Sequence, residues 1–141
     1  MILLDTNVVS ELMKSAPDRL VIEWLNRQDS GSLHLSAVTV GEIVYGLSIL
    51  PDGRRRERLR ERFRLFVSRA FEGRIHPYDD AAATVYSELM GARRKSGRPM
   101  SLPDGQIAAI VHVLGMTIAT RNVKDSDACG VAVINPFQAE P

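Results

Sequence analysis

Short apolar runs alternate along this chain with longer segments of helical periodicity, and this alternation restricts the fold more than any other feature. Four runs are typical of buried strands: ILL at 2–4, LHL at 33–35, MTIA at 116–119 and VAVI at 131–134. Strands that alternate with helices pair in parallel through right-handed crossovers, and such sheets bind ligands at the carboxyl ends of their strands. The sequence therefore predicts an α/β fold with its functional site at that edge.

The helical segments between these runs have recognisable starts and stops. Ser36 is placed to cap one helix, and Gly97 and Gly115 are placed to end two others. No internal repeat or linker interrupts the chain, so we expect one domain over residues 1–141. The expected helices run from Asp18 to Gln28, from Ser36 to Leu50, along the apolar stripe Leu59, Phe63, Phe66 and Ala70, from Asp79 to Lys95, and from Ser101 to about Leu114.

Composition excludes several classes of protein. Hydrophobic residues make up 45% of the chain and charged residues 25%, which are ordinary values for a globular domain. The single cysteine, Cys129, has no partner for an internal disulfide, and no Cys/His spacing indicates zinc. There is no signal-peptide pattern, and no apolar stretch reaches the roughly 20 residues of a membrane helix. We therefore expect a soluble cytoplasmic protein.

Three apolar segments each contain a single carboxylate. Asp5 is the only charged side chain in the first ten residues, Glu42 is the only one between Ser30 and Pro51, and Asp104 is the only one between Pro99 and Thr120. An unpaired buried carboxylate is costly, so such groups are usually paired or bound to a metal. Three isolated acids therefore suggest one shared partner.

Each acid also has a purely structural interpretation. Asp5 could cap a helix that starts near Asn7, and Asp104 falls at the third position of a helix capped by Ser101, where an acid completes a capping box. Glu42 is harder to explain in this way, because its helix has apolar residues on several faces, is predicted to be buried nearly all round, and contains no lysine or arginine. Capping and metal binding both remain open for Asp5 and Asp104.

Converging carboxylates would suit a narrow range of chemistry. They are hard oxygen ligands that favour Mg²⁺ or Mn²⁺ over zinc or copper. Such a site can activate water and stabilise the charge that builds on a phosphodiester during in-line attack. No P-loop, G-x-S-x-G or G-x-G-x-x-G motif offers another active site. The residues therefore predict metal-assisted hydrolysis of a phosphate ester.

Two basic segments suggest the kind of phosphate ester. Seven arginines lie between Arg54 and Arg64, and a second group comprises Arg93, Arg94, Lys95 and Arg98. These cations could be solvated helix faces with acidic partners such as Glu57 and Glu61. They could also hold a nucleic-acid backbone beside an acidic pocket.

The order of motifs along nearly the whole chain resembles a known family. ILLDTNVVSEL, LSAVTVGEIVYGL, SLPDGQIAA, TIATRNVKD and GVAVINPF are similar to segments of PIN-domain toxins of the VapBC type, especially the FitB-like branch. The resemblance implies a PIN fold, a five-stranded parallel sheet in a three-layer α/β/α arrangement. It implies a Mg²⁺-dependent endoribonuclease, the toxin of a type II toxin–antitoxin system, that forms a homodimer. It also implies a cognate VapB- or FitA-like antitoxin that binds DNA.

The resemblance assigns roles to the isolated acids. Asp5, Glu42 and Asp104 match the family's catalytic, metal-binding carboxylates. Thr6, Asn7 and Thr120 are expected to orient those carboxylates or the metal's waters.

The fourth acidic position of the family departs from the common pattern. Many relatives have an acid directly after Thr-Arg, where this chain has Asn122. Asp125 belongs to a TRNVKD variant and ranks above Asp127 as the fourth catalytic acid. Asn122 is then a neutral contact near the metal.

Two rival functions are considered. A haloacid-dehalogenase-like phosphatase also has an Asp after its first strand, but it needs a second Asp two residues later, where this chain has Asn7. A catalytically inactive PIN-like module could bind RNA or a partner without cutting. The joint presence of Asp5, Glu42 and Asp104 favours the active enzyme.

Overall fold

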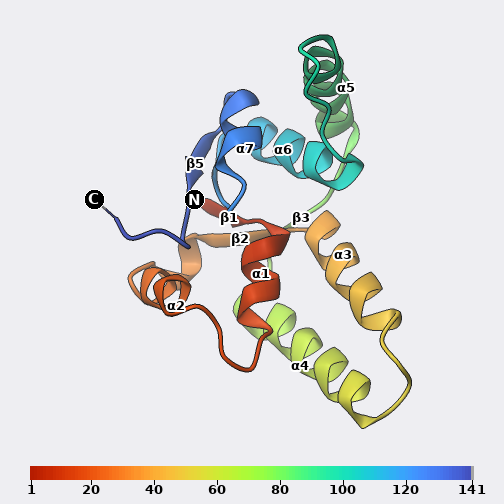
Figure 1. The fold of residues 1–141 in the computed structure, drawn as a ribbon, viewed down its shortest axis with the longest axis vertical. Coiled ribbons are helices and arrows are strands. Elements are labelled where there is room, and N and C mark those ends of the chain that lie inside the picture. The colour runs from red at the N-terminus through yellow and green to blue at the C-terminus, as the bar shows by residue number, and fades with distance from the viewer. Residues whose placement is uncertain (141) are drawn as a thin grey trace.

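The computed structural model describes residues 1–140, which form a five-stranded sheet between two layers of helices (Figure 1). None of its helices has the length and apolar composition needed to cross a membrane. The strands are β1 (Ile2–Leu4), β2 (Leu33–Ser36), β3 (Ile75–His76), β4 (Thr117–Ala119) and β5 (Ala132–Ile134). The helices are α1 (Thr6–Leu12), α2 (Arg19–Asn26), α3 (Ala37–Ser48), α4 (Arg54–Ala70), α5 (Asp80–Lys95), α6 (Leu102–Leu114) and α7 (Val123–Ala128), with a 3₁₀ turn at η1 (Ser30–Ser32).

All neighbouring strands of the sheet are parallel, in the order β3-β2-β1-β4-β5. The chain adds strands on one side of β1 first and then on the other side, starting with β4. In the register of this central pair, Leu4 lies opposite Ala119. Ligands of open α/β sheets bind where the strand order reverses, outside the carboxyl ends of the strands. That position is between the ends of β1 and β4, directly before Asp5 and Thr120.

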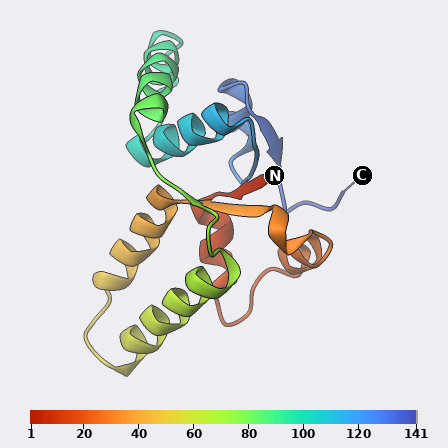
Figure 2. The same ribbon diagram turned by 180° about the vertical axis from the view of Figure 1, so that it is seen from behind.

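Helices cover both faces of the sheet, as the two opposite views show (Figures 1 and 2). Helices α1, α2, α3 and α4 lie on one side, and α5, α6 and α7 lie on the other. The predicted three-layer α/β/α arrangement is therefore confirmed. Since the strands are short, much of the apolar surface that stabilises the fold comes from these helices.

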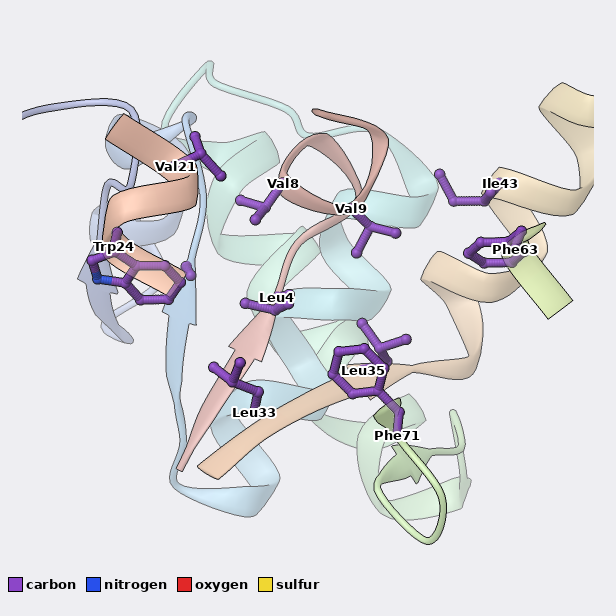
Figure 3. Close-up of a cluster of buried hydrophobic side chains, with 11 residues drawn as sticks. Leu4, Val8, Val9, Val21, Trp24, Leu33, Leu35, Ile43, Phe63 and Phe71 are labelled. Carbon is purple, nitrogen blue, oxygen red and sulfur yellow. The ribbon is translucent and has the colours of Figure 1, made fainter. Parts of the chain in front are cut away.

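Successive side chains of β1 enter two different cores, because neighbouring residues of a strand point to opposite faces. Leu4 belongs to a cluster with Leu35 of β2, Trp24 of α2 and Phe63 of α4 (Figure 3). Leu3 belongs to a second cluster on the α5 and α6 side. Both side chains are fully buried. The central strand is thus held firmly from both faces, which fixes the position of the acid that follows it.

The predicted helices are confirmed to within a few residues, and their caps explain the boundaries. Asp18, Ser36, Asp79 and Ser101 each accept a backbone N–H bond at the start of a helix. Gly115 ends α6 in the left-handed region, with φ at 62°. Polar side chains and one glycine therefore set helix ends that hydrophobic periodicity alone could not locate.

Two elements have no counterpart among the apolar runs. Strand β3 consists only of Ile75 and His76, and neither side chain is fully buried. Helix α7 has the polar sequence VKDSDA with one buried side chain, Ser126. The resemblance to PIN domains implied the fifth strand, but local sequence did not identify it.

Helices α5 and α6 pack closely at Gly105, directly after Asp104. A Cβ atom at Gly105 would lie 2.6 Å from Met90 Sδ and 2.9 Å from Tyr86 Cε2. Met90 can move aside, but the Tyr86 ring packs edge-on against Tyr78 with centroids 6.0 Å apart. We expect Gly105→Ala to lower the free energy of unfolding by about 1 kcal/mol, since overpacking costs about 1–3 kcal/mol and alanine's helix propensity returns about 1.

Gly91 provides the matched control for this prediction, because it lies in helix α5 with no atom within 4 Å of its added Cβ. Gly91→Ala is expected to raise the free energy of unfolding by up to about 1 kcal/mol. Urea unfolding of both variants measures the two changes. Equal stabilisation by both substitutions would show that the α5–α6 contact is not tight at Gly105.

Candidate active site

The candidate site begins where β1 and β4 end. The backbone N–H of Asp5 donates to the carbonyl of Ala119 at 2.9 Å, and that of Thr120 donates to the carbonyl of Ile134 at 2.9 Å. These bonds continue the sheet's pairing by one residue beyond the strands. Asp5 and Thr120 are therefore held side by side at the carboxyl edge.

Asp5 is 8% exposed, and its carboxylate accepts hydrogen bonds on both oxygens. Its Oδ1 accepts from the Thr6 backbone N–H at 2.8 Å, and its Oδ2 accepts from the Thr120 hydroxyl at 2.7 Å and from Asn7 Nδ2 at 3.4 Å. Asp5 is also the N-cap of α1. Capping is thus confirmed, and it leaves the carboxylate at the mouth of the site.

The environment of Asp5 opposes its ionisation. Burial raises the pKa of this carboxyl above its ordinary value of 3.8, and the negative charges of Asp104 and Glu42 raise it further. The hydrogen bonds from Thr120 and Thr6 lower the pKa but do not cancel the rise. A positive charge close to Asp5 would therefore favour its ionised form.

This raised pKa predicts how stability depends on pH. Asp5 binds its proton more tightly in the folded protein than in the unfolded chain, so its stabilising contribution is complete below pH 3.8 and is lost as pH rises through the folded pKa. We expect Asp5→Asn to be more stable than the wild type at neutral pH in EDTA, with an advantage that grows from about pH 4 upward. Thermal melts across pH measure this difference.

Asp127→Asn is the control for this pH dependence, because Asp127 is exposed on α7. It should melt in parallel with the wild type at every pH. Parallel curves for Asp5→Asn would contradict the electrostatic account of Asp5.

Asp104 faces the same site from the first turn of α6. Its backbone N–H donates to the Ser101 hydroxyl at 3.3 Å, so the predicted cap is confirmed. Within residues 1–140, the Asp104 carboxylate itself has no hydrogen-bond donor or cation from the protein. It lines a pocket of about 110 Å³ together with Asp5. The structure therefore brings these two predicted acids together and leaves Asp104 free to bind a ligand.

Glu42 lies beside this pocket rather than in its lining. The Thr6 hydroxyl is 2.7 Å from Glu42 Oε1 and 3.0 Å from the Thr39 hydroxyl, so Thr6 connects the acid on α3 to the residue after Asp5. Glu42 is half-buried and lines a larger neighbouring cleft. Because its charge still raises the pKa of Asp5, Glu42 acts on the acidic site through space.

The prediction that the Glu42 helix is buried nearly all round is wrong. Val44, Tyr45 and Ile49 are 49%, 68% and 67% exposed. Only one side of α3 packs against the molecule, so apolar composition alone misrepresented its environment. Glu42 is found near the other acids because of its position on that packed side.

Asp125 and Asn122 complete the lining of the pocket at α7. Asp125 Oδ1 lies 2.5 Å from Arg93 Nη2, and its Oδ2 accepts from Asn122 Nδ2 at 2.7 Å. Asp127 is exposed and does not line the pocket. Of these two acids only Asp125 lines the pocket, and each of its carboxylate oxygens already has a partner, Arg93 or Asn122.

The polar residues predicted to orient the acids form one network. Asn7 Nδ2 donates to the Thr120 hydroxyl oxygen at 3.1 Å, and the backbone N–H of Asn122 donates to the same oxygen at 3.0 Å. The backbone N–H of Arg121 donates to Asn7 Oδ1 at 3.2 Å. This network ties the loop after β1 to the loop after β4 and fixes the orientation of Asp5.

Arg93 is the participant that the sequence did not reveal. It was considered with the basic group at the end of α5 as a solvated or nucleic-acid-binding cation, but its side chain is 7% exposed. Its spacing of four residues from Leu89 and seven from Tyr86 places it on the apolar stripe of the helix. That periodicity was the available signal that Arg93 faces inward.

The donor set fits a hard divalent cation. In the part of the chain that the structure describes, no three Asp, Glu, His or Cys side chains are already gathered around one point as metal ligands. Mg²⁺ does not require such a cage, because it usually retains several waters and binds one or two carboxylates. Asp5 and Asp104 supply two carboxylates at one pocket, and Asn7 and Asn122 supply neutral amide groups beside them.

Comparisons with known proteins identify the family of this chain. The PIN domain family matches residues 2–129. VapC ribonuclease Y4jK of Sinorhizobium fredii is 41% identical over 138 residues, 98% of this chain and 99% of that relative. Toxin FitB of Neisseria gonorrhoeae is 36% identical over 137 residues, 97% of this chain and 99% of FitB.

A solved structure has the same fold over the whole length. The structure of FitAB bound to an IR36 DNA fragment contains a chain that is 37% identical, with a TM-score of 0.93, and the match covers 100% of this chain and 99% of that one. The chain therefore belongs to the PIN domain family, and within it to the group of toxins that includes VapC and FitB.

Proposed function

We propose that this protein is a Mg²⁺- or Mn²⁺-dependent endoribonuclease and the toxin of a toxin–antitoxin pair. The observation that carries the proposal is that Asp5 and Asp104 face one small pocket at the β1/β4 edge. A bound cation would supply the positive charge that activates water and stabilises negative charge building on the phosphodiester. The VapC and FitB relatives, named as a ribonuclease and a toxin, support RNA as the substrate class.

The protein's own residues have separate tasks in this proposal. Asp5 and Asp104 hold the cation. Thr120 and Asn7 keep the Asp5 carboxylate oriented through their hydrogen bonds, and Thr6 directs Glu42 toward the same region. These hydrogen bonds give the carboxylates fixed partners within the protein, which is the kind of positioning that catalysis at such a site requires.

The partner in this proposal is a cognate antitoxin that also binds operator DNA. The FitAB structure on DNA supports this assignment, since it shows a similar chain in such an assembly. The homodimer implied by the family resemblance remains a prediction, which sedimentation equilibrium of the purified protein would test. An inactive PIN-like binding module remains the alternative, and retention of Asp5, Glu42 and Asp104 argues against it.

Purified protein incubated with RNA tests the proposal directly. We expect internal cleavage in Mg²⁺ or Mn²⁺ and none in EDTA. The metal should also stabilise the fold, by about 2.7 kcal/mol at 100 times its dissociation constant, because it relieves repulsion between Asp5 and Asp104. The double variant Asp5→Asn/Asp104→Asn should gain no stability from metal. Metal-independent cleavage, or a melting temperature that neither metal changes, would contradict the metal dependence.

A further inference from the structure

A second, larger cleft opens beside the acidic pocket. It has a volume of about 760 Å³ and lies between α1, α3 and α4, which share one side of the sheet (Figure 1). Thr6 and Glu42 lie at the end that borders the acidic site, and Arg55 and Arg62 of α4 line the cleft as well. We call this space the α1/α3/α4 cleft. Its lining adjoins the acidic site at Thr6, which donates from its backbone N–H to Asp5 and from its hydroxyl to Glu42.

The arginines of α4 fall into two classes that composition could not separate. Arg56, Arg60 and Arg64 each form an ion pair with a nearby acid of the same segment. Arg55 and Arg62, in contrast, have no carboxylate within 4.0 Å among residues 1–140. Arg54, Arg58 and Arg69 of α4 likewise form no ion pair within the described residues, but among these unpaired arginines Arg55 and Arg62 are the two that line the cleft.

The other side chains that line the cleft are mostly apolar or small. Ile43, Leu47 and Leu59 provide apolar surface, and among the described residues no aromatic side chain lines it. Lys14 also faces the cleft, but its ammonium is 2.7 Å from Glu11 Oε2. Without aromatic side chains the cleft has no platform on which to stack bases, so its two free guanidinium groups are its main means of holding a ligand.

We propose that the α1/α3/α4 cleft binds the phosphate backbone of single-stranded RNA beside the bond to be cut, through Arg55 and Arg62. This inference rests on the proposed ribonuclease function. A substrate cut at the acidic pocket must extend beyond a space of 110 Å³, and the neighbouring cleft carries the positive charge that a polyanion requires. A volume of about 760 Å³ is that of a site for one small ligand, so the cleft accommodates a short single strand rather than a duplex.

Binding of a short fluorescein-labelled single-stranded RNA to the full-length chain tests this proposal. Asp104→Asn is included in every protein so that binding is measured without cleavage. The test pair is Arg55→Gln/Arg62→Gln, and the matched control is Arg60→Gln/Arg64→Gln on the same helix, which removes the same charge outside the cleft. Circular dichroism and thermal melts establish that both pairs are folded.

The salt dependence of binding gives the decisive readout. Loss of two phosphate contacts should reduce the slope of log affinity against log salt by about 1.4, with several-fold weaker binding at about 50 mM salt. The control pair should keep the parent slope. Equal losses by both pairs, or no loss by the test pair, would overturn the proposal. The proposal would likewise be overturned if the test pair lost antitoxin binding but still bound RNA, since Arg55 and Arg62 would then form a protein contact.

Cleavage by the wild-type chain is measured on the same RNA. Suppose that the wild type cuts RNA but the test and control variants bind RNA with the same affinity and salt dependence. The proposed role of the cleft then fails, while the ribonuclease function stands. If the wild type cuts no RNA in either metal, the proposed function itself fails.

Discussion

Replacing Asp104 with asparagine is expected to lower the rate of RNA cleavage by at least about 100-fold while the protein stays folded. Asp104 faces Asp5 across the small pocket, and within residues 1–140 its carboxylate has no donor that would neutralise it. Asparagine keeps the size of the side chain and removes its charge. The N-cap bond survives, because Ser101 accepts from the Asp104 backbone N–H rather than from its side chain.

The substitution also predicts a change in stability that separates it from simple damage. The charge of Asp104 contributes to the raised pKa of Asp5, so its removal should leave the metal-free protein equally or more stable. Asp127→Asn is the matched control, since it is the same chemical change at an exposed acid outside the pocket, and it should cleave RNA like the wild type. Undiminished cleavage by Asp104→Asn would remove Asp104 from the active site.

Much of this site could be predicted from the sequence, because the acids stand alone in apolar segments. A single charge after a buried strand is conspicuous, and parallel α/β topology puts such residues at one edge of the sheet. Strand β1 puts Asp5 at that edge, and Asp104 reaches the same pocket from the first turn of α6. The capping interpretation of Asp5 is correct as well, so capping and acidic-site formation are compatible roles of that residue. At Asp104 only the Ser101 cap is present, because the Asp104 carboxylate does not accept from the Ser101 backbone N–H as a capping box requires.

The remaining errors come from properties that local sequence does not contain. Helix α3 is apolar on several faces, yet Tyr45 is 68% exposed, because the amount of a helix that becomes buried depends on what packs against it. Conversely, Arg93 lies in a run of cations and is nevertheless buried, because its acidic partner follows 32 residues later in the chain. Pairing across that distance is a property of the tertiary structure, and neither charge nor periodicity alone predicts it.

The ion pair of Arg93 and Asp125 supports the second large prediction, because its two members differ in exposure. The Arg93 side chain is 7% exposed and the Asp125 side chain is 35% exposed. Removal of the acid leaves a guanidinium that water cannot reach. Removal of the arginine leaves a carboxylate that water reaches in part and that still accepts from Asn122. The two single substitutions should therefore have unequal costs.

We expect Asp125→Ala to lower the free energy of unfolding by about 3–5 kcal/mol and Arg93→Met by only about 1–2 kcal/mol. Urea unfolding of both variants and of the double variant measures these values and the coupling between them. The double variant should be more stable than Asp125→Ala, since the methionine fills the apolar stripe of α5 without a charge. If Asp125 served mainly as a metal ligand, Asp125→Ala would cost less stability than Arg93→Met in protein measured without metal. Loss of the carboxylate would then relieve repulsion among the acids. The order of the two losses thus decides whether Asp125 serves chiefly as the anchor of α7 or as a fourth ligand-binding acid.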